Sequence, residues 1–137
     1  RAARRRQSLR LRRTVMLRWL LATLLAVGLA MALRPLTPHA SPETWFRHSD
    51  KLVHFTFFAV AWWLGVQAGL RPGWRLGLGL LAYGGVMELA QAFLTSGRGA
   101  SLTDVAADGI GLLLGAALTY RAARRGRSAG QPQEHRR

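Results

Sequence analysis

Polar and ionisable side chains interrupt the apolar stretches of this 137-residue chain at a few places, and these are the residue types that could do chemistry. An ionisable group at the centre of a membrane-spanning helix costs about 2.5–3.5 kcal/mol on insertion. Such groups are therefore expected to serve a site or an internal ion pair. The candidates are Asp50, Lys51, His54, Glu88, Gln91, Arg98, Ser101, Asp104 and Asp108.

The spacing of the first two groups places them on helix faces. Asp50 and His54 are four residues apart, and Glu88 and Gln91 are three apart. Side chains at these separations are neighbours on a helix surface. Because Glu88 lies several residues inside its apolar stretch, we expect it to bind a ligand or to form an internal salt bridge.

Two further carboxylates share a helix face with two glycines. The series Asp104, Asp108, Gly111 and Gly115 follows the steps i, i+4, i+7 and i+11. Small residues allow helices to approach closely in lipid, so this face is expected to pack against other helices. Both carboxylates should then point into the bundle, towards a shared pocket in which Lys51 is one of the counter-charges.

Some of these residues are also suited to roles within their own helix or at the membrane surface. Asp50 is suited to cap the N-terminus of a helix and to interact with its dipole. The segment Ser101-Leu-Thr-Asp104 precedes an apolar run and matches a capping box. Lys51 has a stem long enough to snorkel to the membrane surface.

Four apolar stretches are long enough for membrane-spanning helices, which need about 20 residues. Their predicted positions are Val15–Leu33, Leu52–Leu70, Leu76–Leu94 and Leu102–Tyr120. They are apolar on nearly all sides and have short connections, which disfavours a soluble bundle. The predicted fold is all-α, an integral membrane bundle of four transmembrane helices. Gly65-x-x-x-Gly69 predicts a second packing face beside the one formed by Gly111 and Gly115.

The formal net charge of +14 is concentrated at the two ends of the chain. Residues 1–13 hold seven arginines and residues 121–137 hold six, so 13 of the 20 basic residues lie there. Arginine-rich flanks favour the cytoplasm, and an even number of spans returns the chain to the same side. Both termini are therefore predicted to be cytoplasmic, and the polar candidates fall in the outer half of the membrane. The basic ends are expected to contact anionic lipid heads rather than nucleic acid.

The composition predicts three parts. Residues 1–14 form a basic arm, residues 15–120 the membrane domain, and residues 121–137 a disordered basic tail. Met16 begins a typical membrane-protein start, so the arm lies either upstream of the true start or in the cytoplasm. A rival interpretation is a cleaved signal peptide, because Ala30-Met31-Ala32 resembles a cleavage site. The lack of cysteine excludes disulfides and thiolate metal sites.

Three blocks of these residues resemble the VanZ-like family of small bacterial membrane proteins. The blocks are Asp50-Lys51-x-x-His54-Phe55, Glu88-x-x-Gln91 and Arg98-x-x-Ser101-x-x-Asp104-x-x-x-Asp108-x-x-Gly111. The resemblance covers about residues 34–120, although the family usually has Asn at the position of Asp108. It implies a multi-pass protein of the bacterial cytoplasmic membrane. In its namesake the family is linked to glycopeptide resistance, chiefly to teicoplanin.

We expect first a non-enzymatic envelope protein whose outer pocket binds a polar headgroup, a lipid-linked cell-wall precursor, a glycopeptide or a partner protein. Lys51 and Arg98 would contact an anionic group, while Asp104 and Glu88 hold them in place. We expect no cofactor and assign no metal, because no established metalloenzyme spacing such as H-E-x-x-H is present.

Two alternatives remain open. The first is an intramembrane enzyme acting on a lipid-linked substrate, in which a carboxylate serves as general base beside His54 or the cluster holds a divalent ion. The residues that could supply such ligands are Asp50, His54, Glu88, Asp104 and Asp108. The second is a small proton-coupled transporter using Glu88. It is disfavoured because the inner half offers no polar path apart from Gln67.

Overall fold

Long runs of leucine, alanine and other good helix formers, uninterrupted by proline, build this protein. The computed structural model describes residues 2–33, 49–95 and 101–129. These residues form α1 (Ala2–Ala32), α2 (Ser49–Gln67), α3 (Trp74–Leu94) and α4 (Leu102–Ala129), without a strand among them. None of these four helices contains a proline, whose missing N–H and fixed φ would interrupt them. The predicted all-α fold is confirmed for this part of the chain.

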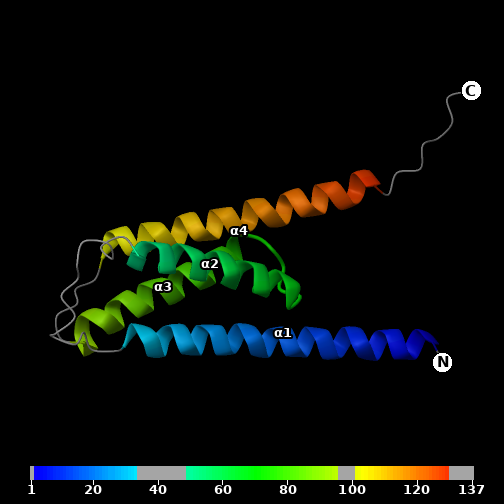
Figure 1. Ribbon diagram of the computed structural model, residues 1–137, viewed down its shortest axis with the longest axis horizontal. Coiled ribbons are helices and arrows are strands. Elements are labelled where there is room, and N and C mark those ends of the chain that lie inside the picture. Colours follow the sequence, from blue (N-terminus) through cyan, green and yellow to red (C-terminus); the bar gives the residue numbers. More distant parts are fainter. Residues whose placement is uncertain (1, 34–48, 96–100, 130–137) are drawn as a thin grey trace, which may run out of the picture.

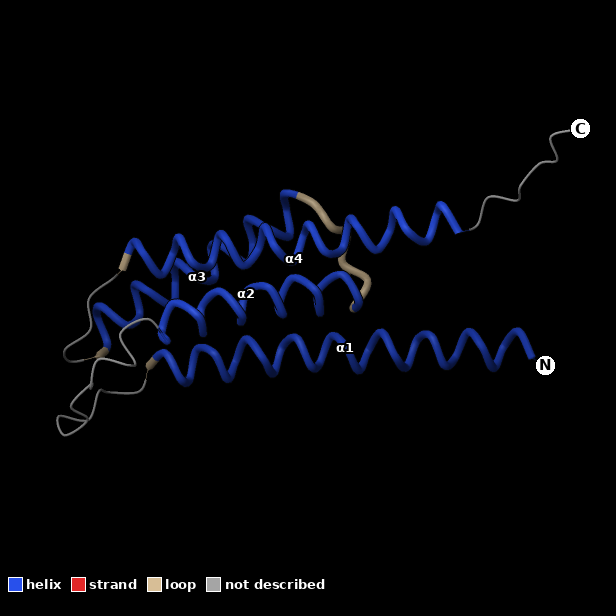
Figure 2. The backbone as a smooth tube through the Cα atoms, turned by 45° about the horizontal axis from the view of Figure 1, so that its top comes forward, coloured by secondary structure: helices blue, strands red, loops and turns tan. Residues whose placement is uncertain are grey.

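The helices run alternately in opposite directions. Figure 1 shows that the N-terminal end of α1 and the C-terminal end of α4 lie at the same end of the bundle. Figure 2 shows the same arrangement from another side, with the short α2–α3 connection also at this end. Among the described residues α2 contacts each of the other helices, and its most extensive contact is with α4. The residues that begin α2 and α4 and end α3 therefore meet at the opposite end.

Three of the helices are long and apolar enough to cross a membrane. They are the segments Ala3–Ala32, Trp74–Leu94 and Leu102–Gly126 within α1, α3 and α4. Large apolar side chains such as Trp19, Phe93 and Leu113 are exposed on their surfaces, which suits a lipid environment. The predicted span 52–70 corresponds to α2, which is not one of the three. Its 19 residues begin with a polar turn and lie against the other helices.

Two helices extend further than the apolar runs alone predict. The helix of α1 begins at Ala2, so the basic arm continues the first span as one helix. The prediction of a disordered tail from residue 121 is wrong for residues 121–129, because α4 continues to Ala129. Alanine and arginine are both good helix formers, and this explains the extension. The last segment, residues 130–137, lies outside the described residues.

The predicted glycine seam of α4 is confirmed as its packing face against α2. An added Cβ at Gly111 would overlap the backbone carbonyl of Phe55, and one at Gly115 would lie 2.8 Å from the Cβ of Trp62. Both glycines are buried. Close backbone approach of this kind compensates for the weak apolar driving force between helices in lipid.

The two glycines of the second predicted pair, Gly65 and Gly69, have different roles. Gly65 is buried, and an added Cβ would lie 3.3 Å from Leu76 of α3, so its packing role is confirmed. The packing role predicted for Gly69 is wrong, because it follows the end of α2 with a φ of 85°. The N–H of Gly69 donates to the carbonyl of Val66, and that of Leu70 donates to the carbonyl of Gly65. This is a Schellman cap, which favours glycine in the left-handed conformation.

Side-chain hydrogen bonds join α1 to the end of α2 and to α3. Arg18 Nε donates to the carbonyl oxygen of Ala68 at the end of α2, over 3.2 Å. The hydroxyl of Tyr83 in α3 donates to the carbonyl oxygen of Leu25. Between these helices, Gly28 leaves room for the ring of Phe57. The first helix is therefore held in a fixed position against α2 and α3.

Candidate functional site

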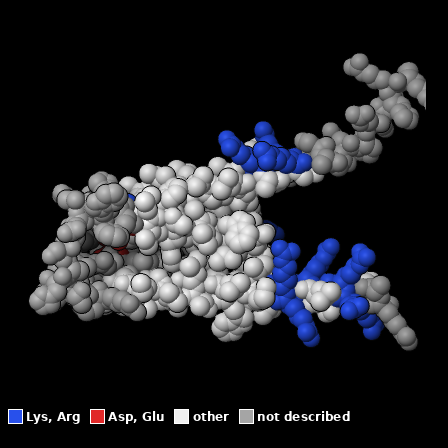
Figure 3. All heavy atoms as spheres, viewed as in Figure 1, with Lys and Arg blue, Asp and Glu red and all other residues white. Residues whose placement is uncertain are grey.

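The polar candidates gather at the end of the bundle opposite the arginine-rich helix ends. In Figure 3 Lys and Arg crowd the projecting ends of α1 and α4, while Asp and Glu appear at the other end. We call the residues brought together there the polar cluster. It consists of Asp50, Lys51, His54, Glu88, Gln91, Ser101, Asp104 and Asp108. Arg98, which was predicted to join them, lies outside the described residues.

A buried pair joins α2 to α4 at the heart of the polar cluster. His54 Nδ1 lies 2.8 Å from Asp108 Oδ1, and Asp108 is fully buried. With Asp108 as the carboxylate acceptor, Nδ1 carries the proton, and in the neutral ring Nε2 has a lone pair. Gly84 of α3 makes room for this carboxylate, since an added Cβ would press on Asp108 Oδ2. Gly84 was missed, although it lies four residues before Glu88 on the same helix face.

Glu88 reaches from α3 to the first turn of α4. Its Oε2 accepts a hydrogen bond of 2.7 Å from the backbone N–H of Ser101. The hydroxyl of Ser101 in turn accepts from the N–H of Asp104 at 3.3 Å. The predicted capping box is thus half formed: Ser101 caps α4, but Glu88 takes the place that the Asp104 carboxylate would have. Glu88 therefore fixes where α4 begins.

The Asp104 carboxylate instead pairs with α2. Lys51 Nζ lies 3.2 Å from Asp104 Oδ1, which confirms the predicted pairing of the opening charges of α2 with carboxylates of other helices. The Lys51 side chain is 41% exposed, whereas that of Asp104 is 10% exposed. Asp50 is exposed in the first turn of α2, one residue inside the helix. There it interacts favourably with the helix dipole.

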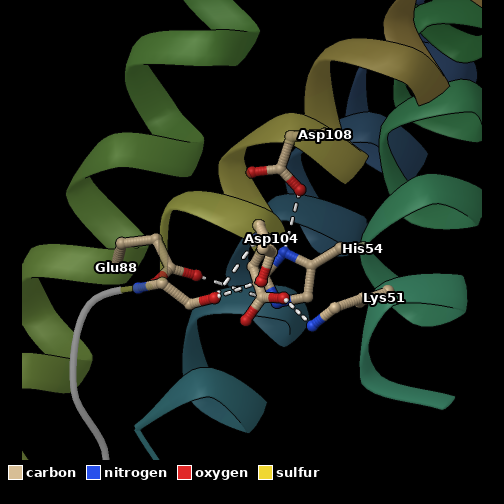
Figure 4. Close-up of polar contacts among 7 residues, drawn as sticks. Lys51, His54, Glu88, Asp104 and Asp108 are labelled. Atoms are coloured by element: carbon tan, nitrogen blue, oxygen red, sulfur yellow. Dashed lines mark hydrogen bonds and ion pairs between the residues drawn. The ribbon is translucent and has the colours of Figure 1, made fainter. Parts of the chain in front are cut away.

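Two carboxylate oxygens in the polar cluster are buried without a hydrogen-bond partner among the described residues. They are Glu88 Oε1 and Asp108 Oδ2. Glu88 Oε1 lies 4.0 Å from His54 Nε2, too far for a hydrogen bond. Figure 4 shows His54 between Asp108 on one side and Glu88 on the other. These two oxygens could therefore accept hydrogen bonds from a ligand in addition to the contacts within the polar cluster.

An apolar cavity of about 350 Å³ adjoins the polar cluster between α1, α2 and α3. Its polar side is formed by Asp50, His54 and Gln91. The remaining lining residues are Leu24, Val27, Gly28, Met31, Ala32, Val53, Phe57, Phe58 and Met87. Val27 and Val53 are each more than half exposed, so the cavity opens at the surface between α1 and α2. Its volume lies within the range of small-molecule sites.

The structure brings together described residues from each of the three sequence blocks. His54, Glu88, Gln91, Asp104 and Asp108 are all buried although polar. The wall contributed by α1 was missed, because the residues of α1 that line the cavity carry no polar side chain that would mark them.

Comparisons of the chain with protein-family models, with curated proteins and with solved structures find no match. The resemblance to the VanZ-like family rests on the three sequence blocks alone.

Proposed function

We propose that this chain is a VanZ-like protein of the bacterial cytoplasmic membrane that binds an amphiphilic ligand. The headgroup would lie at the polar cluster and an apolar chain would occupy the adjoining cavity. The observation that carries the proposal is the position of a buried polar cluster beside an apolar cavity of about 350 Å³, with Asp50, His54 and Gln91 belonging to both. A site with a polar part and an apolar part suits a ligand that has a polar headgroup and an apolar chain.

The distribution of charge supports an extracytoplasmic position for this site. The arginine-rich ends of α1 and α4 lie at one end of the bundle and the polar cluster at the other. By the positive-inside rule, the arginine-rich end faces the cytoplasm, and α2 then completes the fourth crossing. A ligand of the outer leaflet would reach the polar cluster directly. Its apolar chain would enter from the bilayer through the opening between α1 and α2.

The side chains of the polar cluster indicate which chemical groups the headgroup of the ligand should carry. Glu88 Oε1 accepts but cannot donate, so it favours a headgroup carrying hydroxyl, amide or amine N–H and O–H groups. Lys51 is partly exposed and has N–H donors beyond the one directed at Asp104, so it can contact an anionic group of the same ligand. Lipid-linked cell-wall precursors combine both kinds of group on an apolar chain.

The proposed role in resistance predicts a change in glycopeptide susceptibility. Expression of the wild type in a sensitive host should raise the minimal inhibitory concentration of teicoplanin. Glu88→Gln should abolish that rise, because it keeps the shape of the side chain but removes its charge. Gln67→Ala is a matched control, since Gln67 is an exposed residue at the other end of α2.

Membrane levels of the three proteins must be matched by immunoblot. If the wild type leaves susceptibility unchanged at those levels, the resistance role is wrong, while binding of an amphiphile is decided separately, by native mass spectrometry.

A further inference from the structure

We propose that Asp50, His54, Asp104 and Glu88 form a binding site for a divalent cation of the Zn²⁺ type. A carboxylate oxygen of Asp50, a ring nitrogen of His54 and a carboxylate oxygen of Asp104 all lie within 4.8 Å of one another. Two ligand atoms of one tetrahedral Zn²⁺ at 2.0–2.2 Å lie about 3.5 Å apart. Closing the site therefore means drawing these atoms together by up to about 1.3 Å, which side-chain rotations can supply, and the inference does not depend on the amphiphile proposed above.

The ring of His54 is already oriented as a metal ligand requires. Asp108 Oδ1 accepts the Nδ1–H at 2.8 Å and, being fully buried, holds the ring in place. Histidines that bind metals usually donate their other ring N–H to a carboxylate or a carbonyl in this way. The remaining nitrogen, Nε2, lies 4.0 Å from Glu88 Oε1, and in the neutral ring its lone pair is available to a metal.

Glu88 supplies the second, independent indication of a ligand. Its side chain is only 4% exposed, and its Oε1 has no hydrogen-bond partner among the described residues. This oxygen lies 4.0 Å from His54 Nε2, about 0.5 Å more than the separation of two ligands of one tetrahedral Zn²⁺. Figure 4 shows it directed into the polar cluster. A buried carboxylate oxygen without a partner is costly, and a cation at this point removes that cost.

The donor types select the class of cation. One imidazole with carboxylates suits Zn²⁺ or Mn²⁺, whereas Mg²⁺ prefers oxygen ligands alone and retains several waters. The ammonium group of Lys51 competes for Asp104, because it lies 3.2 Å from Oδ1. Since its side chain is 41% exposed, it can move into solvent when a divalent cation takes its place.

The test is a titration of the full chain in detergent, after chelator treatment and desalting, with Zn²⁺ and separately with Mg²⁺. Calorimetry and elemental analysis should give one Zn²⁺ per chain and much weaker binding of Mg²⁺. Asp50→Asn should weaken Zn²⁺ binding by at least about 10-fold, a typical loss even for outer-shell changes. It alters an exposed residue and should leave the fold intact.

Lys51→Met should have the opposite effect and tighten Zn²⁺ binding several-fold, because the competing ammonium group is removed. His135→Ala controls for adventitious binding by a histidine of the C-terminal segment and should change nothing. Absence of Zn²⁺ binding, an unchanged Kd in Asp50→Asn, or weaker binding in Lys51→Met would each overturn the proposal.

Discussion

Replacing Gly111 by alanine is expected to separate α2 from α4 and to destabilise the bundle by about 3 kcal/mol, at the upper end of typical overpacking costs. The added methyl group would overlap the carbonyl oxygen of Phe55. A backbone oxygen in the middle of a helix cannot move aside as the end of a flexible side chain can, so the two helices must shift. Thermal unfolding of the purified protein in detergent measures the loss.

Gly109→Ala is the matched control for this substitution. Gly109 lies two residues away in α4, and an added Cβ meets nothing within 4 Å. Alanine has the higher helix propensity by about 1 kcal/mol, so this variant should be as stable as the wild type or slightly more so. Equal destabilisation by both substitutions would show that the α2–α4 contact is not the close packing described here.

Replacing His54 by leucine should destabilise the protein by about 3–5 kcal/mol, the usual cost of leaving a buried charge without its partner. The reason is the environment of Asp108, which is fully buried and has His54 as the partner of its Oδ1. Leucine leaves that carboxylate in an apolar interior without its hydrogen bond. Denaturant or thermal unfolding in detergent would measure the effect.

The double variant His54→Leu/Asp108→Leu separates this cost from a general disruption of packing. Replacing both partners by apolar residues removes the unpaired carboxylate, so much of the lost stability should return. Lys51→Met breaks the pair with Asp104, in which Lys51 is partly exposed. It should therefore lower the free energy of unfolding by only about 1 kcal/mol or less. Additive losses in the double variant would contradict the assignment of Asp108 as the buried partner of His54.

Much of the helical fold could be predicted from the sequence, because each helix core is an apolar run without proline. The series Asp104, Asp108, Gly111 and Gly115 also predicted a packing face correctly, since helical periodicity fixes which residues share a side. The ends of the helices were not predictable from hydropathy. Alanine and arginine continue a helix in polar sequence as well as in apolar sequence, and so residues 121–129 extend α4.

The candidate site was predictable in its members but not in all of its contacts. Charge alone indicated that Lys51 would pair with a carboxylate of another helix, and it does so with Asp104. The contact of Glu88 with the Ser101 N–H depends on the start of α4, which no spacing pattern fixes. Likewise, the role of Gly69 follows from its backbone φ and not from its distance to Gly65.

The central claim, that the cavity beside the polar cluster holds an amphiphile, is tested most directly by native mass spectrometry of protein extracted in mild detergent. The wild type should retain one amphiphile per chain. Val27→Trp should lose it, because the indole would fill the cavity that Val27 lines. Val86→Trp is the matched control, since the two valines are 53% and 57% exposed and Val86 does not line this cavity. Retention by Val86→Trp and loss by Val27→Trp is the predicted result; equal retention by both variants, or no bound amphiphile in the wild type, would contradict the claim.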